Sequence, residues 1–190
     1  SEYGKTAATI AYGCIPFTKP DENEIKSFGV SRFNYGLLIA RLEAENNIAM
    51  VLDAYSRSAE KGKLLVVGNI STAYGSKLQN LYRKDERIVF TGGIYDMDKL
   101  NNLRHFSKYY FHGHSVGGTN PSLLEAMACE SFIIAHGNEF NRAVLGSDAC
   151  YFTDADTLLA CLNSSQTTAE IRSDFIKNNY EKVKEVYSWP

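Results

Sequence analysis

Residues 108–128 read KYYFHGHSVGGTNPSLLEAMA, and this run contains three structural signals in succession. Residues 108–111, of which the last three are aromatic, predict a short buried strand. Thr119 or Asn120 is suited to cap a following helix, and Pro121 is suited to the first helical position. The run therefore predicts a strand, a glycine-containing loop and an amphipathic helix, each directly after the other.

The same alternation of strands and helices extends over the rest of the chain. Strands are expected at 7–12, 35–40, 63–67, 87–91, 108–111, 131–135 and 150–152, and helices at 46–59, 75–82, 96–106, 121–129, 138–145, 155–162 and 167–187. This order predicts an α/β fold, a doubly wound parallel sheet of the Rossmann-like type with helices on both faces. Residues 14–34 are expected to be a loop or linker. By domain, we expect 1–34 to be a linker and the end of a preceding domain, 35–170 the Rossmann-like domain, and 171–190 a C-terminal helix.

The composition is that of an ordinary globular domain: of 190 residues, 44% are apolar and 22% are charged. The net charge of -2, with scattered basic residues, argues against nucleic acid as a partner. The four cysteines lack the spacing of a zinc site or a disulfide framework, which fits a reducing, cytoplasmic location, and Cys129 and Cys150 are expected in the core. The apolar runs are far shorter than the roughly 20 residues of a transmembrane helix. No transmembrane segment is expected.

Ligands of doubly wound sheets bind beyond the carboxyl ends of the strands. The strand at 35–40 is followed by RLEAENN, which lacks the glycine fingerprint of a dehydrogenase's dinucleotide site. Gly117 and Gly118 instead precede the helix at 121–129, and they let a ligand approach the backbone closely. The amino end of that helix presents free N–H groups and a positive dipole. We predict that a diphosphate binds there.

Glu125 lies just over one turn into this helix, and its side chain leans back towards the amino end. Because a carboxylate repels a phosphate, we expect it to accept hydrogen bonds from the vicinal hydroxyls of a ribose. Simpler interpretations exist, since a glycine turn before a capped helix is common and a carboxylate near a helix start is often only solvated. His112 and His114 have no third ligand at a usable spacing and predict no metal site.

The full run resembles the signature of glycosyltransferase family 4, whose members have the GT-B fold. In that signature a glycine-rich loop leads into a helix, here Pro121–Ala128, which reads PSLLEAMA. The longer string HGHSVGGTNPSLLEAM at 112–127 resembles the subgroup that includes bacterial rhamnosyltransferases of cell-surface polysaccharide assembly. The segments at 39–47 and 67–69 resemble two further parts of the family pattern, and the resemblance covers residues 8–152.

The resemblance implies an enzyme of two Rossmann-like domains, of which the first binds the acceptor and the second binds a nucleoside-diphosphate sugar. This chain resembles the second domain, so we expect the acceptor-binding half to lie outside it and the chain alone to be inactive. The implied reaction is that of a hexosyltransferase in surface polysaccharide synthesis, which moves the sugar of dTDP-rhamnose or a similar donor to a glycan or lipid-linked glycan. The reaction is expected to retain anomeric configuration and to need no metal or other cofactor. The full-length enzyme is expected in the cytoplasm, at the inner face of the membrane and with peripheral contact to it.

The resemblance also implies site residues. Arg41 and Glu125 are the expected catalytic residues, because Arg41 matches the arginine that contacts the donor diphosphate and neutralises its charge. The expected donor-binding residues follow the predicted strands and are Gly68, Asn69, Tyr95, His114, Gly117, Gly118, Thr119, Asn120, Ser122 and Glu125. Backbone groups of the loop at 92–94 are expected at the edge of the nucleobase. Glu139 is either a further donor contact or only an acid at a helix start.

Two positions depart from the family pattern. Gly117 stands where the family has the first glutamate of an E-x7-E pair, so sugar contacts are expected from backbone N–H groups or a neighbouring side chain. Asn46 stands where the family has a lysine, so either Arg41 carries the phosphate charge alone or Lys77 or Arg83 contributes. The missing glutamate favours one alternative, a non-catalytic nucleotide-binding domain. A GT-B nucleotide-sugar epimerase, which would need further carboxylates in the cleft, is the other alternative.

Overall fold

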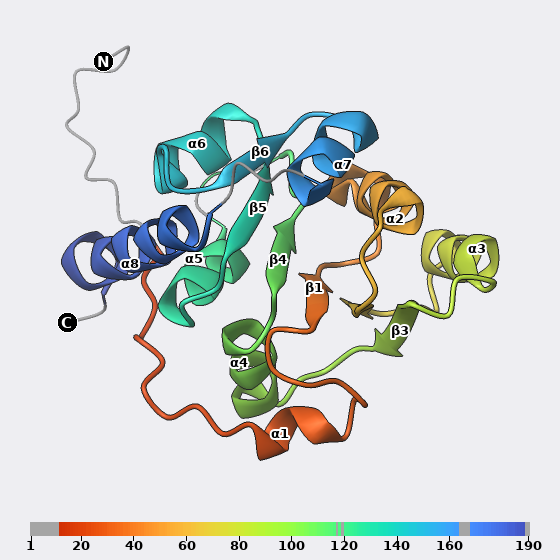
Figure 1. The fold of residues 1–190 in the computed structure, drawn as a ribbon, viewed down its shortest axis with the longest axis horizontal. Coiled ribbons are helices and arrows are strands. Elements are labelled where there is room, and N and C mark those ends of the chain that lie inside the picture. The colour runs from red at the N-terminus through yellow and green to blue at the C-terminus, as the bar shows by residue number, and fades with distance from the viewer. Residues whose placement is uncertain (1–11, 117, 119, 164–167, 189–190) are drawn as a thin grey trace, which may run out of the picture.

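The computed structural model describes residues 12–116, 118, 120–163 and 168–188. In this part of the chain, six parallel strands form one sheet in the order β3-β2-β1-β4-β5-β6 (Figure 1). They are β1 (Tyr35–Ile39), β2 (Lys63–Val67), β3 (Ile88–Gly92), β4 (Tyr109–His112), β5 (Ile133–His136) and β6 (Cys150–Phe152). This order is that of a doubly wound Rossmann-like sheet, so the predicted fold class is confirmed.

Helices follow the strands and cover both faces of the sheet. They are α1 (Asn23–Lys26), α2 (Ile48–Arg57), α3 (Ala73–Tyr82), α4 (Met97–His105), α5 (Pro121–Ala128), α6 (Glu139–Leu145), α7 (Ala155–Asn163) and α8 (Ala169–Val186), with a 3-10 turn η1 (Ala44–Asn46) before α2. Buried side chains of α4, α5 and α6 form one apolar core, and those of α2, α3 and α7 form a second core on the opposite face.

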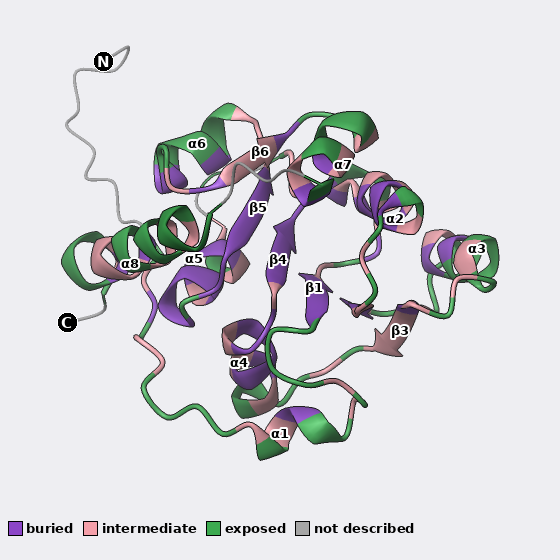
Figure 2. Cartoon of the chain, viewed as in Figure 1, coloured by how far each residue is buried: buried purple, intermediate pink, exposed green. Residues whose placement is uncertain are grey.

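Successive side chains of the central strands enter the two cores in turn. In β1, Leu37 packs in the core of α4 and α5, whereas Leu38 packs in the core of α2 and α7. In β4, Tyr110 and Phe111 divide in the same way. Because helices cover both faces, these strands are buried along most of their length (Figure 2). Burial on both sides explains why their sequences are continuously apolar and do not alternate.

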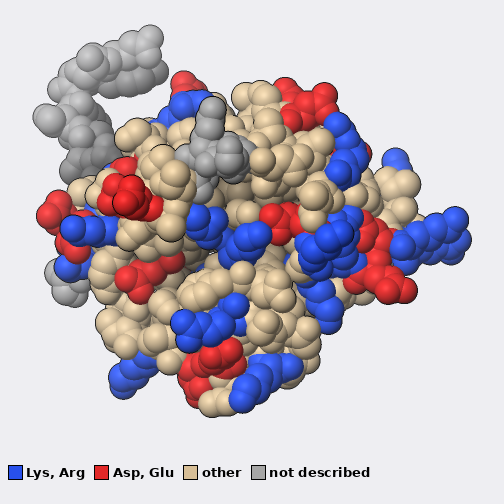
Figure 3. Space-filling model, in the orientation of Figure 1, with Lys and Arg blue, Asp and Glu red and all other residues tan. Residues whose placement is uncertain are grey.

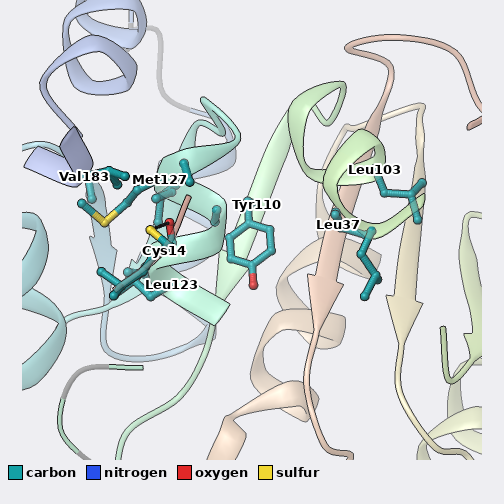
Figure 4. Close-up of a cluster of buried hydrophobic side chains, with 14 of the residues drawn as sticks. Cys14, Leu37, Leu103, Tyr110, Leu123, Met127 and Val183 are labelled. Atoms are coloured by element: carbon teal, nitrogen blue, oxygen red, sulfur yellow. Dashed lines mark hydrogen bonds between the residues drawn. The ribbon is translucent and has the colours of Figure 1, made fainter. Parts of the chain in front are cut away.

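The segment that precedes α1 lies against α5 and the end of α8. The backbone N–H of Cys14 donates to the carbonyl oxygen of Tyr187 at 2.8 Å, and its thiol donates to the carbonyl oxygen of Leu124 at 3.4 Å. Figure 4 shows Cys14 and Val183 of α8 beside Met127 of α5. Segments from both ends of the described chain therefore meet on α5.

Two sequence expectations were incomplete, and a third falls almost entirely outside the described residues. Residues 14–34 contain the short helix α1, which no periodic pattern indicated; its one buried residue, Ile25, packs in the core, so tertiary contact stabilises a helix too short to be stable alone. Cys129 is buried as expected, but Cys150 is only half-buried, because it lies on the edge strand β6. Of the strand expected at 7–12, only Tyr12 is described, and it is not in a strand. The other expected strands and helices are present, with ends within two residues of prediction.

Two surface properties bear on the predicted partners. Acidic and basic side chains are interspersed on the face shown in Figure 3. In the part of the chain that the structure describes, no helix has the length and apolar character needed to span a bilayer.

The core of α5 gives a first test of the fold. Leu124→Ala removes a fully buried side chain, so we expect it to lower the free energy of unfolding by about 2–5 kcal/mol. Leu81→Ala is the matched control, because Leu81 on α3 is 65% exposed, and its effect should stay within about 0.5 kcal/mol. Urea denaturation measures both changes, and equal losses would contradict the burial of α5.

Candidate functional site

The candidate site lies where the strand order reverses. β1 and β4 are neighbours in the sheet, but the chain leaves β1 towards β2 and leaves β4 towards β5, so their carboxyl ends border a crevice. The loop after β1 carries Arg41, and the loop after β4 carries His114. Burial, and next the charge of Arg41, lower the pKa of His114. The two loops therefore lie within electrostatic range of each other.

A cavity of about 390 Å³ opens beside the loop after β1. It brings together four of the predicted site residues, Arg41, Gly68, Asn69 and Tyr95, with Ile39, Ala40, Leu42, Glu43, Val67, Thr72, Gly93 and Ile94 as the other lining residues. Gly68 is required by the fold itself, because a Cβ atom there would lie 2.3 Å from the carbonyl oxygen of Ala40. Tyr95 is largely exposed, which leaves its ring free of the core.

The amino end of α5 has the expected capped geometry. The side-chain oxygen of Asn120 accepts from the backbone N–H of Ser122 at 2.9 Å, and Pro121 occupies the first turn. Asn120 is therefore the N-cap, which resolves the choice between it and Thr119. Gly117 and Thr119 lie outside the described residues.

Two glycines near this helix have opposite surroundings. A Cβ atom on Gly113 would lie 2.2 Å from the carbonyl oxygen of Asn46, so the close contact of two loops requires glycine there. A Cβ atom on Gly118 would meet no atom of the described residues within 4 Å. The fold does not require Gly118, and open space adjoins its backbone at the predicted phosphate site.

Asn46, which replaces the family's lysine, is buried in the loop after β1, and its carbonyl oxygen closely approaches Gly113 in the loop after β4. Its side-chain amide donates to the carbonyl oxygen of Arg41 at 2.8 Å. The next residue, Asn47, donates to the carbonyl oxygen of Gly113 at 2.8 Å, and the hydroxyl of Ser115 donates to the carbonyl oxygen of Glu45 at 2.8 Å. The last two of these hydrogen bonds hold the segment that contains η1 against the loop after β4. Sequence reasoning identified Asn46 only as a missing cation.

A second cavity, of about 280 Å³, is bordered by the first half of α4, one side of α5 along its whole length, and residues 13–15. Its lining residues are Gly13, Cys14, Ile15, Met97, Asn101, Pro121, Glu125, Ala128 and Cys129. The β3–α4 loop supplies Gly93, Ile94 and Tyr95 to the first cavity, and α4 begins with Met97 in the second. Glu125 therefore lies in a cavity that extends from the amino ends of α4 and α5, at the predicted edge of the sheet, to the end of α5.

Within this cavity, Glu125 is already engaged by Arg104 of α4. A guanidinium N–H of Arg104 donates to Oε2 of Glu125, and the other terminal nitrogen donates to Oδ1 of Asn101 at 3.0 Å. The Arg104 side chain is 2% exposed and that of Glu125 is 31% exposed. Sequence reasoning missed Arg104, because no motif marks a buried arginine near the end of a helix.

Two other predicted polar residues have partners inside the protein. The hydroxyl of Ser122 is hydrogen-bonded to that of Tyr110, at 2.7 Å, so it faces the core at the start of α5. The carbonyl oxygen of His114 accepts from the side-chain amides of Asn138 and Asn141, at 2.9 and 3.0 Å. The roles of Ser122 and His114 in donor binding stay predictions.

The rings of His112 and His114 stack with their centroids 4.5 Å apart. Neither ring nitrogen of His112, nor Nδ1 of His114, has a hydrogen-bond partner among the described residues. Burial lowers the pKa of His112 well below its ordinary value, and the neighbouring His114 lowers it further. Both imidazoles are therefore neutral near pH 7, and they add no positive charge to the crevice.

The other charged residues that the sequence suggested as donor contacts lie in different parts of the fold. Arg83 is the C-cap of α3 and precedes β3, which places it at the amino edge of the sheet, opposite the crevice. Lys77 lies within α3. Glu139 is the first residue of α6, and Asn138 caps that helix, a position in which an acid interacts favourably with the helix dipole.

The sequence pattern of one protein family matches this chain. The glycosyl transferases group 1 pattern covers residues 21–182, which include every strand and every helix of the crevice described above. The chain belongs to this family. No curated protein shows a significant sequence match to this group 1 glycosyl transferase chain.

Several solved structures have the same fold as this chain. The C-terminal domain of a group 1 family glycosyl transferase, LpcC, from Francisella tularensis matches with a TM-score of 0.75 at 16% identity, over 93% of this chain and 96% of that one. A glycosyltransferase from Rickettsia africae has a TM-score of 0.75 at 14% identity, and the match covers 88% of this chain and 47% of that one. Anabaena HepE, in complex with UDP and glucose, has a TM-score of 0.75 at 14% identity, and the match covers 88% of this chain and 48% of that one. The group 1 chain therefore spans about half the length of the latter two.

The contrast between Gly113 and Gly118 predicts different effects on stability. Gly113→Ala should destabilise the chain by about 1–3 kcal/mol, because the new methyl group overlaps the backbone of Asn46. Gly118→Ala should leave the free energy of unfolding within about 0.5 kcal/mol of the original value. Thermal denaturation of the two variants provides the comparison. A large loss in Gly118→Ala would mean that the fold, and not a ligand, requires that glycine.

The histidine pair predicts a loss of stability in acid. The unfolded chain binds a proton near pH 6.5, and the folded chain binds it only at lower pH, so stability is full above about pH 6.5 and falls below it, by about 1.4 kcal/mol per pH unit and group. His112→Leu should flatten this dependence between pH 6.5 and 5. His114 and His136, whose pKa values burial also lowers, remain in the variant as an internal reference. Parallel stability curves for the two proteins would contradict the burial of a neutral His112.

Proposed function

We propose that this chain is the donor-binding half of a GT-B glycosyltransferase, which binds a nucleoside-diphosphate sugar and releases the diphosphate as the sugar is transferred. One observation carries the proposal: the capped amino end of α5 lies at the crevice between β1 and β4, on the edge of the sheet where Arg41 lies. A helix amino end and an arginine are two independent sources of stabilisation for a diphosphate.

Charge stabilisation is the main catalytic contribution that this half offers. The leaving diphosphate gains negative charge as the sugar departs, and fixed N–H groups of α5 together with Arg41 stabilise it. The Arg41 side chain is 78% exposed, and its guanidinium lies 3.6 Å from the carboxylate of Glu43. A bound diphosphate would draw Arg41 into the crevice, because the diphosphate carries two negative charges and Glu43 carries one that is exposed and screened by water.

The nucleoside is proposed to lie along the β3–α4 loop. The carboxylate of Glu125 accepts hydrogen bonds from the pentose in the cavity that Met97 and Asn101 also line. Gly68, Asn69 and Tyr95 border the neighbouring cavity and contact the donor from β2 and β3. Backbone groups of Gly117 to Asn120, with His114, are proposed to contact the sugar.

The finer assignment follows the resemblance of the sequence. We propose dTDP-rhamnose or a similar donor, a glycan or lipid-linked glycan acceptor held by a preceding domain, and a role in surface polysaccharide synthesis. Residues 1–34 would then include the connection to that domain. HepE, a solved structure of the same fold, is described in complexes with UDP and with UDP-glucose, which supports a nucleotide-sugar donor here.

A nucleotide-binding domain without transferase activity is the second candidate. It is favoured by Gly117, which stands where the family pattern has a sugar-contacting glutamate. Turnover of a donor by the full-length protein, in the presence of an acceptor, distinguishes the two candidates, because a binding domain would hold the nucleotide and release no diphosphate.

Calorimetric titration with the diphosphates of uridine, thymidine, guanosine and adenosine tests the donor site. We expect one of them to bind best, and Arg41→Ala to weaken its binding about tenfold, the effect of losing one hydrogen bond to a charged group. Arg83→Ala is the matched control, because it removes an arginine from the opposite edge of the sheet. Equal losses in the two arginine variants would argue for a general effect of charge and against this site.

Glu125 is tested with glutamine in preference to alanine. Removing the carboxylate altogether leaves the buried Arg104 without its partner, a change that costs about 3–5 kcal/mol in fully buried pairs. Glutamine keeps an oxygen that accepts from Arg104 and removes the charge, so a folded Glu125→Gln variant with weaker binding supports contact with the donor. Unchanged binding would assign Glu125 to the fold alone.

A further inference from the structure

The two terminal nitrogens of the Arg104 guanidinium donate hydrogen bonds to two different residues that line the second cavity. One terminal nitrogen donates to Oε2 of Glu125, and the other donates to Oδ1 of Asn101 at 3.0 Å. An arginine that used both nitrogens on one carboxylate would occupy both of its oxygens. Here the division leaves Oε1 of Glu125 without a hydrogen bond from any described residue, in a side chain that is 31% exposed to the cavity.

Surrounding contacts hold this arrangement in place. The carbonyl oxygen of Arg104 accepts from the hydroxyls of Ser107 and Ser131, at 2.8 and 3.0 Å, which fixes the end of α4 against the strand that follows α5. Its guanidinium is buried, so it cannot exchange Glu125 for water. Asn101 Oδ1 also accepts from the thiol of Cys129, at 3.5 Å, and this contact fixes the second partner. Oε2 of Glu125 therefore keeps its hydrogen bond to Arg104.

This hydrogen bond changes what Glu125 can recognise. The two hydroxyls of a ribose match the two oxygens of a free carboxylate one to one, and each hydrogen bond to a charged acceptor contributes to affinity. Oε2 can still accept a second hydrogen bond, because each carboxylate oxygen has two lone pairs. Its negative charge already faces the buried guanidinium of Arg104, so a hydroxyl at Oε2 gains less than a hydroxyl at Oε1. A 2′-deoxyribose has a single free ring hydroxyl, at the 3′ position, so it loses little at such a site.

We propose that Arg104 is a specificity-determining residue, which weakens Oε2 of Glu125 as an acceptor and thereby lets the site bind 2′-deoxynucleoside diphosphates about as tightly as ribonucleoside diphosphates. This inference rests on the proposed donor site. It assigns the 3′ hydroxyl to Oε1 of Glu125, and it makes Arg104 act through Glu125, with no contact of its own to the donor.

The test uses uridine diphosphate, 2′-deoxyuridine diphosphate and 3′-deoxyuridine diphosphate, which share one base. Calorimetric titration of the unaltered chain should give dissociation constants for the first two within about threefold of each other. The 3′-deoxy compound should bind about tenfold more weakly, the effect of one hydrogen bond to a charged group. A tenfold preference for uridine diphosphate over its 2′-deoxy form would overturn the inference and leave the donor site intact.

Two variants separate this role from a structural one. Arg104→Met frees Oε2, so the preference for uridine diphosphate over the 2′-deoxy compound should rise to about tenfold, whatever the change in absolute affinity. Arg104→Lys retains a cation beside Oε2 and should keep the ratio within about threefold. A structural role alone would lower the melting temperature and leave the ratio unchanged in both variants, which would overturn the proposal.

The same experiment distinguishes failure of the donor site itself. If the folded chain bound none of the three diphosphates, nor those of the other bases, the proposed function and this inference would both be overturned. If Arg104→Met failed to fold, the unaltered chain and Arg104→Lys would decide. A tenfold preference of both for uridine diphosphate over its 2′-deoxy form would contradict the proposed effect of Arg104 on Oε2.

Discussion

The pairing of β1 with β4 is the constraint on which the crevice depends. Their register sets Leu37 opposite Tyr110 and Leu38 opposite Phe111, so the two strands end at the same height. The loops that follow then diverge to opposite sides, and the space between them is the crevice. The hydrogen bonds from Asn47 to Gly113 and from Ser115 to Glu45 join the two loops, and the hydrogen bond from Asn46 to Arg41 stabilises the loop after β1. A ligand therefore meets a preformed site, which reduces the entropy lost on binding.

The sequence predicted those parts of the site that local patterns encode. Apolar runs gave the strands, and Pro121 with Asn120 gave the start of α5, because propensity and capping act between neighbouring residues. The short helix α1 escaped prediction because its single buried residue, Ile25, is stabilised by the rest of the core. Arg104 and Glu125 are 21 positions apart, and only the packing of α4 against α5 brings them together.

The role of Asn46 was also not predictable from the sequence, because it too depends on tertiary packing. Compared with the family pattern, it appeared as the loss of a cation near the phosphates. In the structure it is buried, and its amide fixes the carbonyl oxygen of Arg41, so the loop gains rigidity where it lacks charge. A lysine could not take this place without burying an ammonium group, which is costly unless paired. The side chain at this position therefore affects phosphate binding through the placement of Arg41.

The electrostatics of the crevice follow from these placements. The two stacked histidines are neutral because burial lowers their pKa values, and Arg104 is neutralised by Glu125. Arg41 has an exposed side chain that is only weakly paired with Glu43. Among the described residues at the crevice edge, it is therefore a cation that remains available for a ligand. The rest of the positive potential has to come from the fixed N–H groups of α5, which need no counterion and no reorganisation. Fixed dipoles favour an anion of one shape in one position, whereas flexible lysines would attract anions of any kind. A site that relies on the helix end with one arginine therefore gains selectivity for a correctly placed diphosphate over other anions in solution.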